Sequence, residues 1–319
     1  MIETKIVSPK VSILIPVFNR KDYFTECIQS ALDQNFTDFE VVVVDNASED
    51  GTWEMCQKFA AMDSRVRIFR NDSNIGPVRN WMRCAVEAKG EFSKILFSDD
   101  CLESNCLSEM VPKLDDPAVA LVFCAARIGK SRDESIVAYS QVDSLRVSSP
   151  QFLNLVLSGK APVSPGAVLI RTHDLLKNLH IQFPTSTPRH FEKNGAGPDV
   201  MILLLTAHSY PYAANISIPL VYFRAHAGSF TIENSNNDVI KGYRSAIAFF
   251  LIRNHGRQPW IDYLAHSWLQ QMRFDRRWRN PRSHLIEYEG VGSAAEVLKL
   301  FLFSFWHLLN KLLGKRFVS

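Results

Sequence analysis

Two adjacent aspartates follow a short apolar run in the first third of the chain. Residues 92–98 read FSKILFS, and Asp99 and Asp100 come directly after them. Two neighbouring carboxylates repel each other, and a hard divalent cation such as Mg²⁺ or Mn²⁺ binds carboxylates together with phosphate oxygens. The pair is therefore a candidate site for a cation and a diphosphate, whereas an Asp-Asp pair taken alone is also common in solvated turns.

Polar residues also follow three earlier apolar segments of the chain. In an open parallel sheet, ligands bind beyond the carboxyl ends of the strands. Besides the aspartate pair, the candidate residues at these ends are Pro16, Phe18, Asn19, Asp45, Asn74, Gly76 and Arg79. Each loop by itself reads as an ordinary turn, but four such loops in succession predict a nucleotide-binding edge.

The segments that must position these residues alternate between two periodicities. Residues 11–18 and 39–46 are near-continuous apolar runs, as expected of strands that are covered on both faces. A helix is expected after each run, over 22–34 and over about 51–62, with apolar residues at helical spacing in the first. This alternation predicts an α/β fold with a doubly wound, mainly parallel sheet flanked by helices.

The organisation of the chain changes towards its C-terminus. We expect a main domain over 1–240, made of a first half at 1–125 and a second half at 126–240 on the same sheet. Residues 241–319 read as a basic helical extension, with 13 Lys or Arg against 5 Asp or Glu, which leaves 23 against 28 in the first 240. The end of this extension, 291–319, is expected either to contact a membrane surface or to pack on the body or on a second subunit, as in a homo-oligomer.

Composition indicates a reducing compartment. The six cysteines form no CxxC pair, so we expect reduced thiols and a cytoplasmic location, with peripheral contact to the inner face of the cytoplasmic membrane. Lys299, His307 and Lys311 interrupt the last apolar stretch, which is too short to span a bilayer. No nucleic-acid partner is expected, because a single basic cluster such as RRWRNPR (276–282) is usually a solvated or membrane-facing surface.

Several common nucleotide and hydrolase motifs are missing from the sequence. There is no G-x-G-x-x-G after the first apolar run, no G-x-x-x-x-G-K-[ST] and no G-x-S-x-G. These absences argue against dinucleotide oxidoreductases, P-loop enzymes and α/β-hydrolases. A diphosphate bound here must be neutralised by something other than glycine amides, and a divalent cation on aspartates is the simplest solution.

Four segments resemble, in order and spacing, the nucleotide-sugar-binding half of the family 2 glycosyltransferases with the GT-A fold. They read VSILIPVFNR (11–20), FEVVVVDNASEDGT (39–52), NIGPVRN (74–80) and ILFSDD (95–100), and residues 197–231 resemble the acceptor-side half of that family. The resemblance covers residues 9–232. It implies an inverting, metal-dependent hexosyl- or deoxyhexosyltransferase that uses a UDP- or dTDP-sugar. The acceptor is expected to be a lipid-linked saccharide in O-antigen, capsule or exopolysaccharide assembly.

The resemblance also implies a role for each candidate residue. The expected donor-binding residues are Pro16, Phe18, Asn19, Asp45, Asn74, Gly76, Arg79, Asp99 and Arg224. Asp45 is expected to accept a hydrogen bond from a pyrimidine base, while Asp100 and His226 hold the divalent cation. Arg224 either neutralises the diphosphate or forms a structural ion pair. Asp199, which opens a helix, is expected to be the catalytic base, although an aspartate there is also a common N-cap.

Three other kinds of protein compete with this interpretation. A nucleotidyltransferase that makes the activated sugar would have a glycine-rich loop with Arg and Lys where this chain has IPVFNRKD. A nucleotide-sugar-binding or scaffold protein of the same fold is favoured by two departures: Phe97 stands where the family often has a carboxylate, and Asp199 has no acidic neighbour. A processive polysaccharide synthase is disfavoured, because the sequence has neither spanning segments nor Q-x-x-R-W.

Overall fold

The computed structural model describes residues 8–142, 144–184, 191–226, 238–256 and 258–263, together with scattered residues between 295 and 310. Two compact units make up the chain. The first comprises Met1–Gln182 and Phe191–Ser235, and the second comprises Phe183–His190 and Asn236–Ser319. The first unit contains all the strands described below and every predicted site residue.

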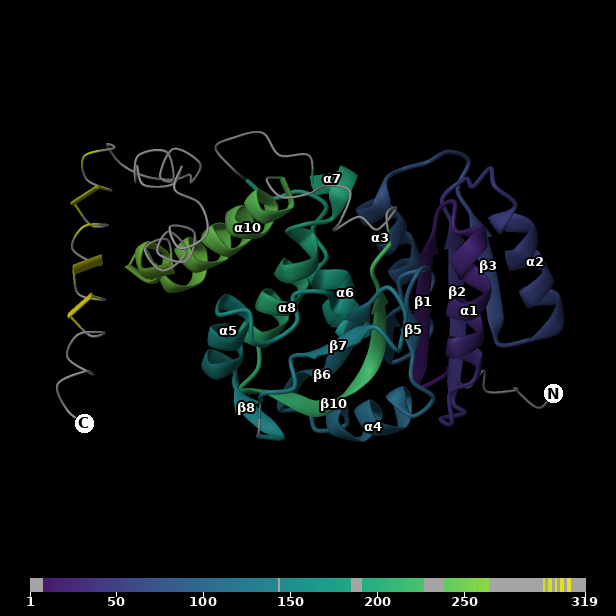
Figure 1. Ribbon diagram of the computed structural model, residues 1–319, viewed down its shortest axis with the longest axis horizontal. Helices are drawn as coiled ribbons and strands as arrows, with labels where there is room; N and C mark the ends of the chain where they lie inside the picture. The colour runs from purple at the N-terminus through teal and green to yellow at the C-terminus, as the bar shows by residue number, and fades with distance from the viewer. Residues whose placement is uncertain are drawn as a thin grey trace, which may run out of the picture. The chain divides into compact units, whose positions relative to one another are not determined.

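A ten-stranded sheet forms the centre of the first unit (Figure 1). Its order is β3-β2-β1-β4-β9-β6-β10-β5, with β7 paired to β6 and β8 paired to β10. Parallel pairing joins β1 to β2 and β4, β2 to β3, and β6 to β10. The strands are β1 Val11–Val17, β2 Phe39–Asp45, β3 Val66–Arg70, β4 Phe92–Ile95, β5 Cys101–Leu102, β6 Val119–Gly129, β7 Ser135–Ala138, β8 Arg146–Ser148, β9 Val168–Arg171 and β10 Tyr212–Arg224.

Helices cover both faces of this sheet. One apolar cluster joins the sheet to α1, α2 and α4, and a second joins it to α3, α6 and α8. The helices with both ends among the described residues are α1 Lys21–Leu32, α2 Thr52–Met62, α3 Pro77–Glu87, α4 Cys106–Leu114, α5 Ser149–Leu157, α6 Thr172–Asn178, α7 Phe191–Asn194, α8 Pro198–His208 and α10 Asp238–His255, with a 3₁₀ turn η1 at Pro165–Ala167. The predicted doubly wound α/β fold is confirmed.

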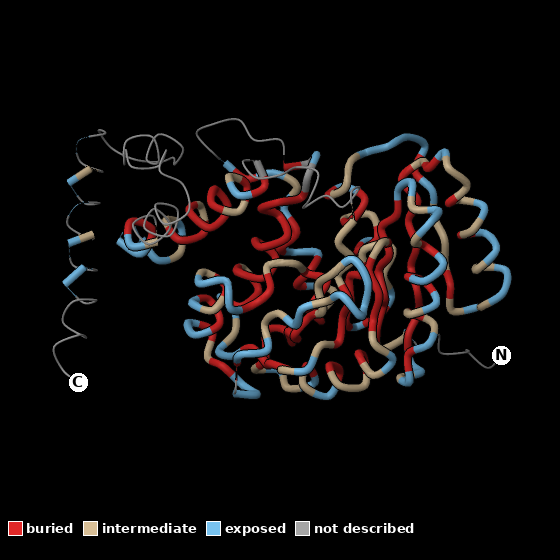
Figure 2. Tube along the Cα trace, viewed as in Figure 1, coloured by how far each residue is buried: buried red, intermediate tan, exposed pale blue. Residues whose placement is uncertain are grey.

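The four consecutive valines of β2 are explained by the covering of the strand on both faces. Val41 and Val43 belong to one cluster, and Val42 and Val44 belong to the other, because successive side chains of a strand point to opposite faces. All seven residues of β1 and of β2 are buried, which Figure 2 shows as red strands at the centre of the unit. The two strands pair in parallel over their full length, so their carboxyl ends reach the same edge.

The strand before the aspartate pair is shorter than its apolar sequence predicts. The parallel ladder between β1 and β4 ends at the pair Leu14 and Ile95, and the chain then turns, with the amide of Asp100 donating to the carbonyl oxygen of Phe97 at 2.9 Å. The antiparallel pairing of β5 with β10 then places the end of β10 beside this turn.

In the second unit, the middle of α10 is buried on more than one side, and the buried residues include Ala246, Phe250 and Leu251. This is the helix predicted from KGYRSAIAFFLIRN. Among the described residues, no helix is both long and apolar enough to cross a membrane. The basic cluster 276–282 and most of the segment 291–319 lie outside the described residues.

Candidate active site

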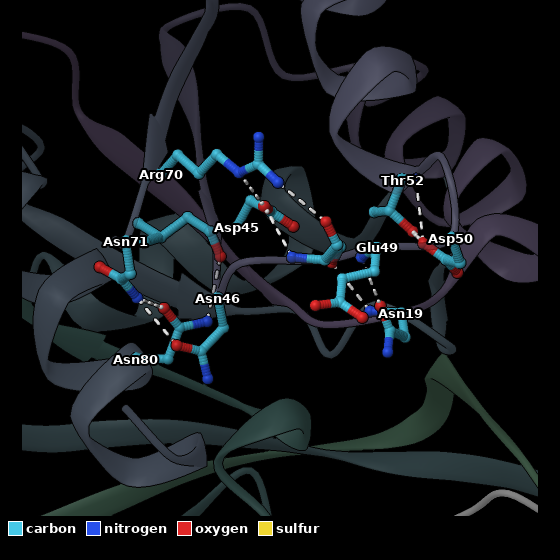
Figure 3. Close-up of polar contacts among 11 residues, drawn as sticks. Asn19, Asp45, Asn46, Glu49, Asp50, Thr52, Arg70, Asn71 and Asn80 are labelled. Carbon is cyan, nitrogen blue, oxygen red and sulfur yellow. Dashed lines mark hydrogen bonds and ion pairs between the residues drawn. The ribbon is translucent and has the colours of Figure 1, made fainter. Parts of the chain in front are cut away.

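The loops after β1 and β2 are hydrogen-bonded to each other (Figure 3). The amide of Asn19 donates to Ser48 Oγ at 2.9 Å, and the amide of Glu49 donates to Asn19 Oδ1 at 3.0 Å. The amide of Arg20 donates to Thr52 Oγ1 at 3.0 Å. Asn19 has a φ of 49°, a left-handed conformation that asparagine tolerates better than most residues. These contacts hold the two predicted nucleotide-binding loops together as one rim.

Asp45 is the last residue of β2 and is completely buried. Its Oδ2 accepts from the amide of Ser48 at 3.1 Å and forms an ion pair with Arg70 Nε, also at 3.1 Å (Figure 3). Its Oδ1 is buried and has no hydrogen-bond partner among the described residues. An unsatisfied buried acceptor of this kind is costly, and a ligand N–H would satisfy it. The predicted role of Asp45 as an acceptor for the base requires such a free acceptor atom.

A network of asparagine side chains ties the end of β2 to the loop before α3. Asn46 Nδ2 donates to Asn74 Oδ1 at 2.8 Å, and Asn71 Nδ2 donates to Asn46 Oδ1 at 3.0 Å and to Asn80 Oδ1 at 2.9 Å. Asn74 Oδ1 also accepts from the amide of Gly76. Sequence analysis did not single out Asn71 and Asn80. The sequence feature that could have identified them is the position of each asparagine directly after an arginine, in the segments RND and VRN.

The other predicted donor residues of this edge differ in exposure. Pro16 lies inside β1 and is buried, whereas Phe18 is 37% exposed. Gly76 has a φ of 84° and precedes Pro77, the first residue of α3. Arg79 is exposed on α3. Phe18 and Arg79 therefore have surface available for a ligand, while Pro16 and Gly76 shape the backbone.

The aspartate turn meets the end of β10. Asp100 is buried, and its Oδ1 accepts from the amide of Arg224 at 3.0 Å. Arg224 Nε donates to the carbonyl oxygen of Asp99 at 3.1 Å, and its guanidinium group forms an ion pair with Glu26 on α1. The structural ion pair, one of the two roles expected for Arg224, is thus formed in this structure.

Asp99 and Asp100 have different surroundings. His226 Nε2 lies 3.0 Å from Asp99 Oδ2, and Arg20 Nε lies 3.6 Å from the same oxygen. The His226 ring also stacks on Tyr23, with the centroids 4.5 Å apart. Burial, followed by the negative charge of Asp99, raises the pKa of Asp100 well above its usual range. Asp99 therefore has an imidazole and a guanidinium group beside it, whereas Asp100 is a buried carboxyl with little compensation.

These residues fit a divalent cation that would also bind phosphate oxygens. The turn supplies hard carboxylate oxygens, and His226 beside it supplies an imidazole. A cation beside Asp100 would favour the ionised form of this carboxyl, which burial and the charge of Asp99 disfavour. The described residues include no ready-made cluster of three or more His, Cys, Asp and Glu ligands. A cation here would depend on ligands from a bound nucleotide.

Asp199 lies in the first turn of α8 and is 7% exposed. Gly197, with a φ of 123°, occupies the N-cap position, so Asp199 is not the N-cap itself. Its Oδ1 nevertheless accepts from the amides of Gly197 at 2.8 Å and Val200 at 2.7 Å. These hydrogen bonds fix the orientation of the Asp199 side chain at the positive end of the helix.

Comparison with known proteins agrees with this geometry. The model of the family described as "Glycosyl transferase family 2" matches residues 12–184. A GalNAc(5)-diNAcBac-PP-undecaprenol beta-1,3-glucosyltransferase of Campylobacter jejuni is 35% identical over 109 residues, which are 34% of this chain and 35% of that protein. The putative teichuronic acid biosynthesis glycosyltransferase TuaG of Bacillus subtilis is 28% identical over 115 residues, which are 36% of this chain and 46% of that protein. The chain thus spans less than half the length of these curated relatives.

Solved structures match a larger part of the chain. The crystal structure of S. aureus TarS 1-349 in complex with UDP-GlcNAc has a TM-score of 0.65 and 21% identity, and the match covers 84% of this chain and 74% of that one. The same protein in complex with UDP has a TM-score of 0.62 at 20% identity. This likeness confirms the predicted GT-A-like architecture.

Proposed function

Because the chain belongs to glycosyl transferase family 2, we propose that it transfers one sugar from a nucleotide-diphosphate sugar to an acceptor hydroxyl, with inversion at the anomeric carbon. The chain is a glycosyltransferase related to enzymes of polysaccharide biosynthesis. The observation that carries the finer proposal is the convergence of Asp99, Asp100, Arg224 and His226 at the edge where β1, β2 and β4 end.

The donor is a UDP- or dTDP-sugar. A uracil or thymine ring carries one N–H that could donate to the unpartnered Oδ1 of Asp45, and Asn19 and Phe18 line the same rim. TarS, which shares this fold, has been crystallised with UDP-GlcNAc. Arg70, whose side chain is partly exposed, pairs with the buried Asp45, so the base would displace or lie against that guanidinium group.

The diphosphate lies over the aspartate turn. Asp100, with Asp99 and His226, would hold a Mg²⁺ or Mn²⁺ ion, which when bound supplies positive charge for the departing nucleoside diphosphate. Arg20 lies beside the carboxylate of Asp99 and contributes a further positive charge. Arg224 acts through its backbone, because its amide fixes the carboxylate of Asp100 while its guanidinium group pairs with Glu26.

Asp199 is the catalytic base of the proposed reaction. Its carboxylate takes the proton of the acceptor hydroxyl, the resulting oxygen attacks the anomeric carbon, and the bond from that carbon to the diphosphate oxygen breaks. One displacement of this kind inverts the anomeric configuration. Proton removal by a positioned base is worth about 10²–10⁴-fold in rate, and charge stabilisation and positioning supply the remainder.

The acceptor is a lipid-linked saccharide in surface-polysaccharide assembly, such as O-antigen, capsule or exopolysaccharide. Support comes from the Campylobacter relative, whose name includes an undecaprenol-linked saccharide. The basic extension 241–319 would bring the protein to the inner face of the cytoplasmic membrane through 291–319.

A substitution at Asp199 tests the proposal. Wild-type protein is first incubated with UDP-, dTDP- and GDP-sugars, Mn²⁺ and saccharide acceptors to identify the donor. Asp199→Asn should then lower kcat by about 10²–10⁴-fold and leave nucleotide affinity nearly unchanged. Asp174→Asn is the matched control, because Asp174 is also a buried aspartate in the first turn of a helix, α6, and should retain transfer.

Each outcome of this experiment has a defined meaning. Full activity of Asp199→Asn would remove Asp199 from the mechanism. Nucleotide binding without transfer by the wild-type protein would favour a nucleotide-sugar-binding or scaffold protein instead. The absence of any nucleotide-induced rise in melting temperature would refute the donor site.

A further inference from the structure

Trp81 on α3 contacts both sides of the proposed site. On one side its ring packs on Phe97, with the centroids 5.3 Å apart and the planes inclined by 55°. On the other side its indole lies against the backbone of Gly195. A Cβ atom at position 195 would be 2.3 Å from Trp81 Cη2 and 2.8 Å from Cζ2. No side chain fits at position 195 unless the indole moves.

Gly195 is connected directly to the first turn of α8. The amide of Asp199 donates to the carbonyl oxygen of Gly195 at 3.3 Å, and the amide of Gly195 donates to Phe191 O at 2.9 Å. Gly195 has a φ of +72°, a conformation that glycine adopts at little cost. The position of Gly195 therefore sets where α8 begins and where the carboxylate of Asp199 lies.

Phe97 is connected in the same way to the aspartate turn. Its carbonyl oxygen accepts from the amide of Asp100 at 2.9 Å and from Cys27 Sγ at 3.5 Å. Phe97 is partly buried against the same apolar cluster that contains Trp81. An aromatic ring at this position can pack on an indole, whereas a carboxylate buried there would lose its hydration at a large cost in free energy.

We propose that Trp81 is a positioning residue that fixes the spacing between the Asp99–Asp100 turn and Asp199. The inference rests on the roles given to these three residues under the proposed function. Trp81 is 8% exposed and belongs to the same buried apolar cluster as Leu14, Val42 and Val44 of the sheet, so its ring has little room to move. The indole acts as a rigid spacer between the group that holds the leaving diphosphate and the group that activates the acceptor.

Gly195→Ala tests this role, with Gly159→Ala as a matched control. Gly159 has a φ of +69°, close to that of Gly195, but a Cβ atom there has nothing within 4 Å. Both substitutions thus introduce similar backbone strain, and Gly195→Ala alone forces the indole to move. Since a misplacement of about 1 Å can cost about 10²-fold in rate, Gly195→Ala should lower kcat by about that factor and leave the KM for the donor nearly unchanged. Gly159→Ala should change neither constant.

A second substitution separates the contact from general damage to the fold. The atoms nearest to the added Cβ are Cη2, Cζ2 and Cζ3 of the indole, the outer edge that a phenylalanine ring at position 81 does not reach. Trp81→Phe should therefore restore part of the kcat that Gly195→Ala removes. A double variant no more active than Gly195→Ala would contradict the contact.

Hydrogen exchange provides a readout that does not depend on activity. The amides of Asp199 and Met201 bond to the carbonyl oxygens of Gly195 and Gly197, so Gly195→Ala should accelerate exchange in residues 197–201 and Gly159→Ala should not. If exchange differs in this way but the wild-type protein transfers no sugar, the proposed function fails and the spacer contact stands. If the two alanine variants have equal kcat, the positioning role of Trp81 is overturned, whatever their exchange rates.

Discussion

The carboxyl of Asp100 should destabilise the folded protein when no cation is bound. Burial and the charge of Asp99 raise its pKa, while the amide of Arg224 and the charge of Lys94 act in the opposite direction with smaller effect. A raised pKa means that the folded state binds more protons than the unfolded state between the two pKa values. Stability contributed by protonated Asp100 is therefore present below the unfolded pKa and declines as the pH rises towards the folded pKa.

Asp100→Asn removes the charge and keeps the geometry. The asparagine oxygen can still accept from the amide of Arg224, which Asp100 Oδ1 does at 3.0 Å. Each unit by which the pKa is raised corresponds to about 1.4 kcal/mol. With an unfolding entropy of about 2.1 cal/mol/K per residue, each such unit predicts a rise of about 2 °C in Tm for a protein of this size. The variant should be more stable than the wild type at pH 7 without metal, and the difference should vanish near pH 4.

Differential scanning calorimetry between pH 4 and pH 8 measures this effect. Asp63→Asn is a control of opposite sign, because the hydrogen bond from Arg65 lowers the pKa of Asp63, and its loss should reduce Tm at pH 7. Mn²⁺ with UDP should raise the Tm of the wild type by mass action and should raise that of Asp100→Asn much less. A metal-free Asp100→Asn protein that melts at or below the wild-type temperature at pH 7 would refute this account of the aspartate turn.

Two further predictions concern the core. A Cβ atom at Gly90 would lie 2.4 Å from the backbone nitrogen of Ser12 in β1. Gly90→Ala should therefore lower the free energy of unfolding by about 1–3 kcal/mol, measured by urea titration. A variant as stable as the wild type would show that the strand can move to make room. Burial raises the pKa of Cys101 to about 11 and that of Cys124 to about 12, and all six cysteines are buried. The native protein should therefore react slowly with a thiol reagent such as DTNB at pH 8, and six thiols should react in urea; a rapidly labelled native thiol would contradict this.

The sheet and its flanking helices could be predicted because local pattern determines them. The continuous valines of β2 required apolar contacts on both faces, and both faces are covered in the structure. The end of β4 could not be predicted in the same way. Leu96 and Phe97 are as apolar as the residues before them, but the ladder to β1 stops at Ile95. The partner strand β1 continues to Val17, so the ladder ends because the chain after β4 turns away, with the amide of Asp100 bonded to the carbonyl oxygen of Phe97.

Some site residues could likewise be predicted from local pattern, whereas others depend on distant partners. Asp45, Asp99 and Asp100 could be selected because each ends or follows a predicted strand, and the carboxyl ends of parallel strands share an edge. The alternatives for Arg224 could not be resolved from sequence. Its ion-pair partner Glu26 is separated from it by 198 positions, and no local pattern links a helix near the N-terminus to the end of β10.

The two adjacent aspartates take on different roles because the fold surrounds them differently. Asp99 Oδ2 already has His226 at 3.0 Å and Arg20 at 3.6 Å, so an added cation would gain less there and would meet positive charge. Asp100 has a backbone amide on one oxygen and a pKa raised by burial, so the same cation would gain more by binding it. A divalent ion at this turn should therefore bind Asp100 as its main protein ligand. His226 contacts Asp99 in this structure. It would either leave Asp99 to bind the ion directly or hold Asp99 in position beside the ion.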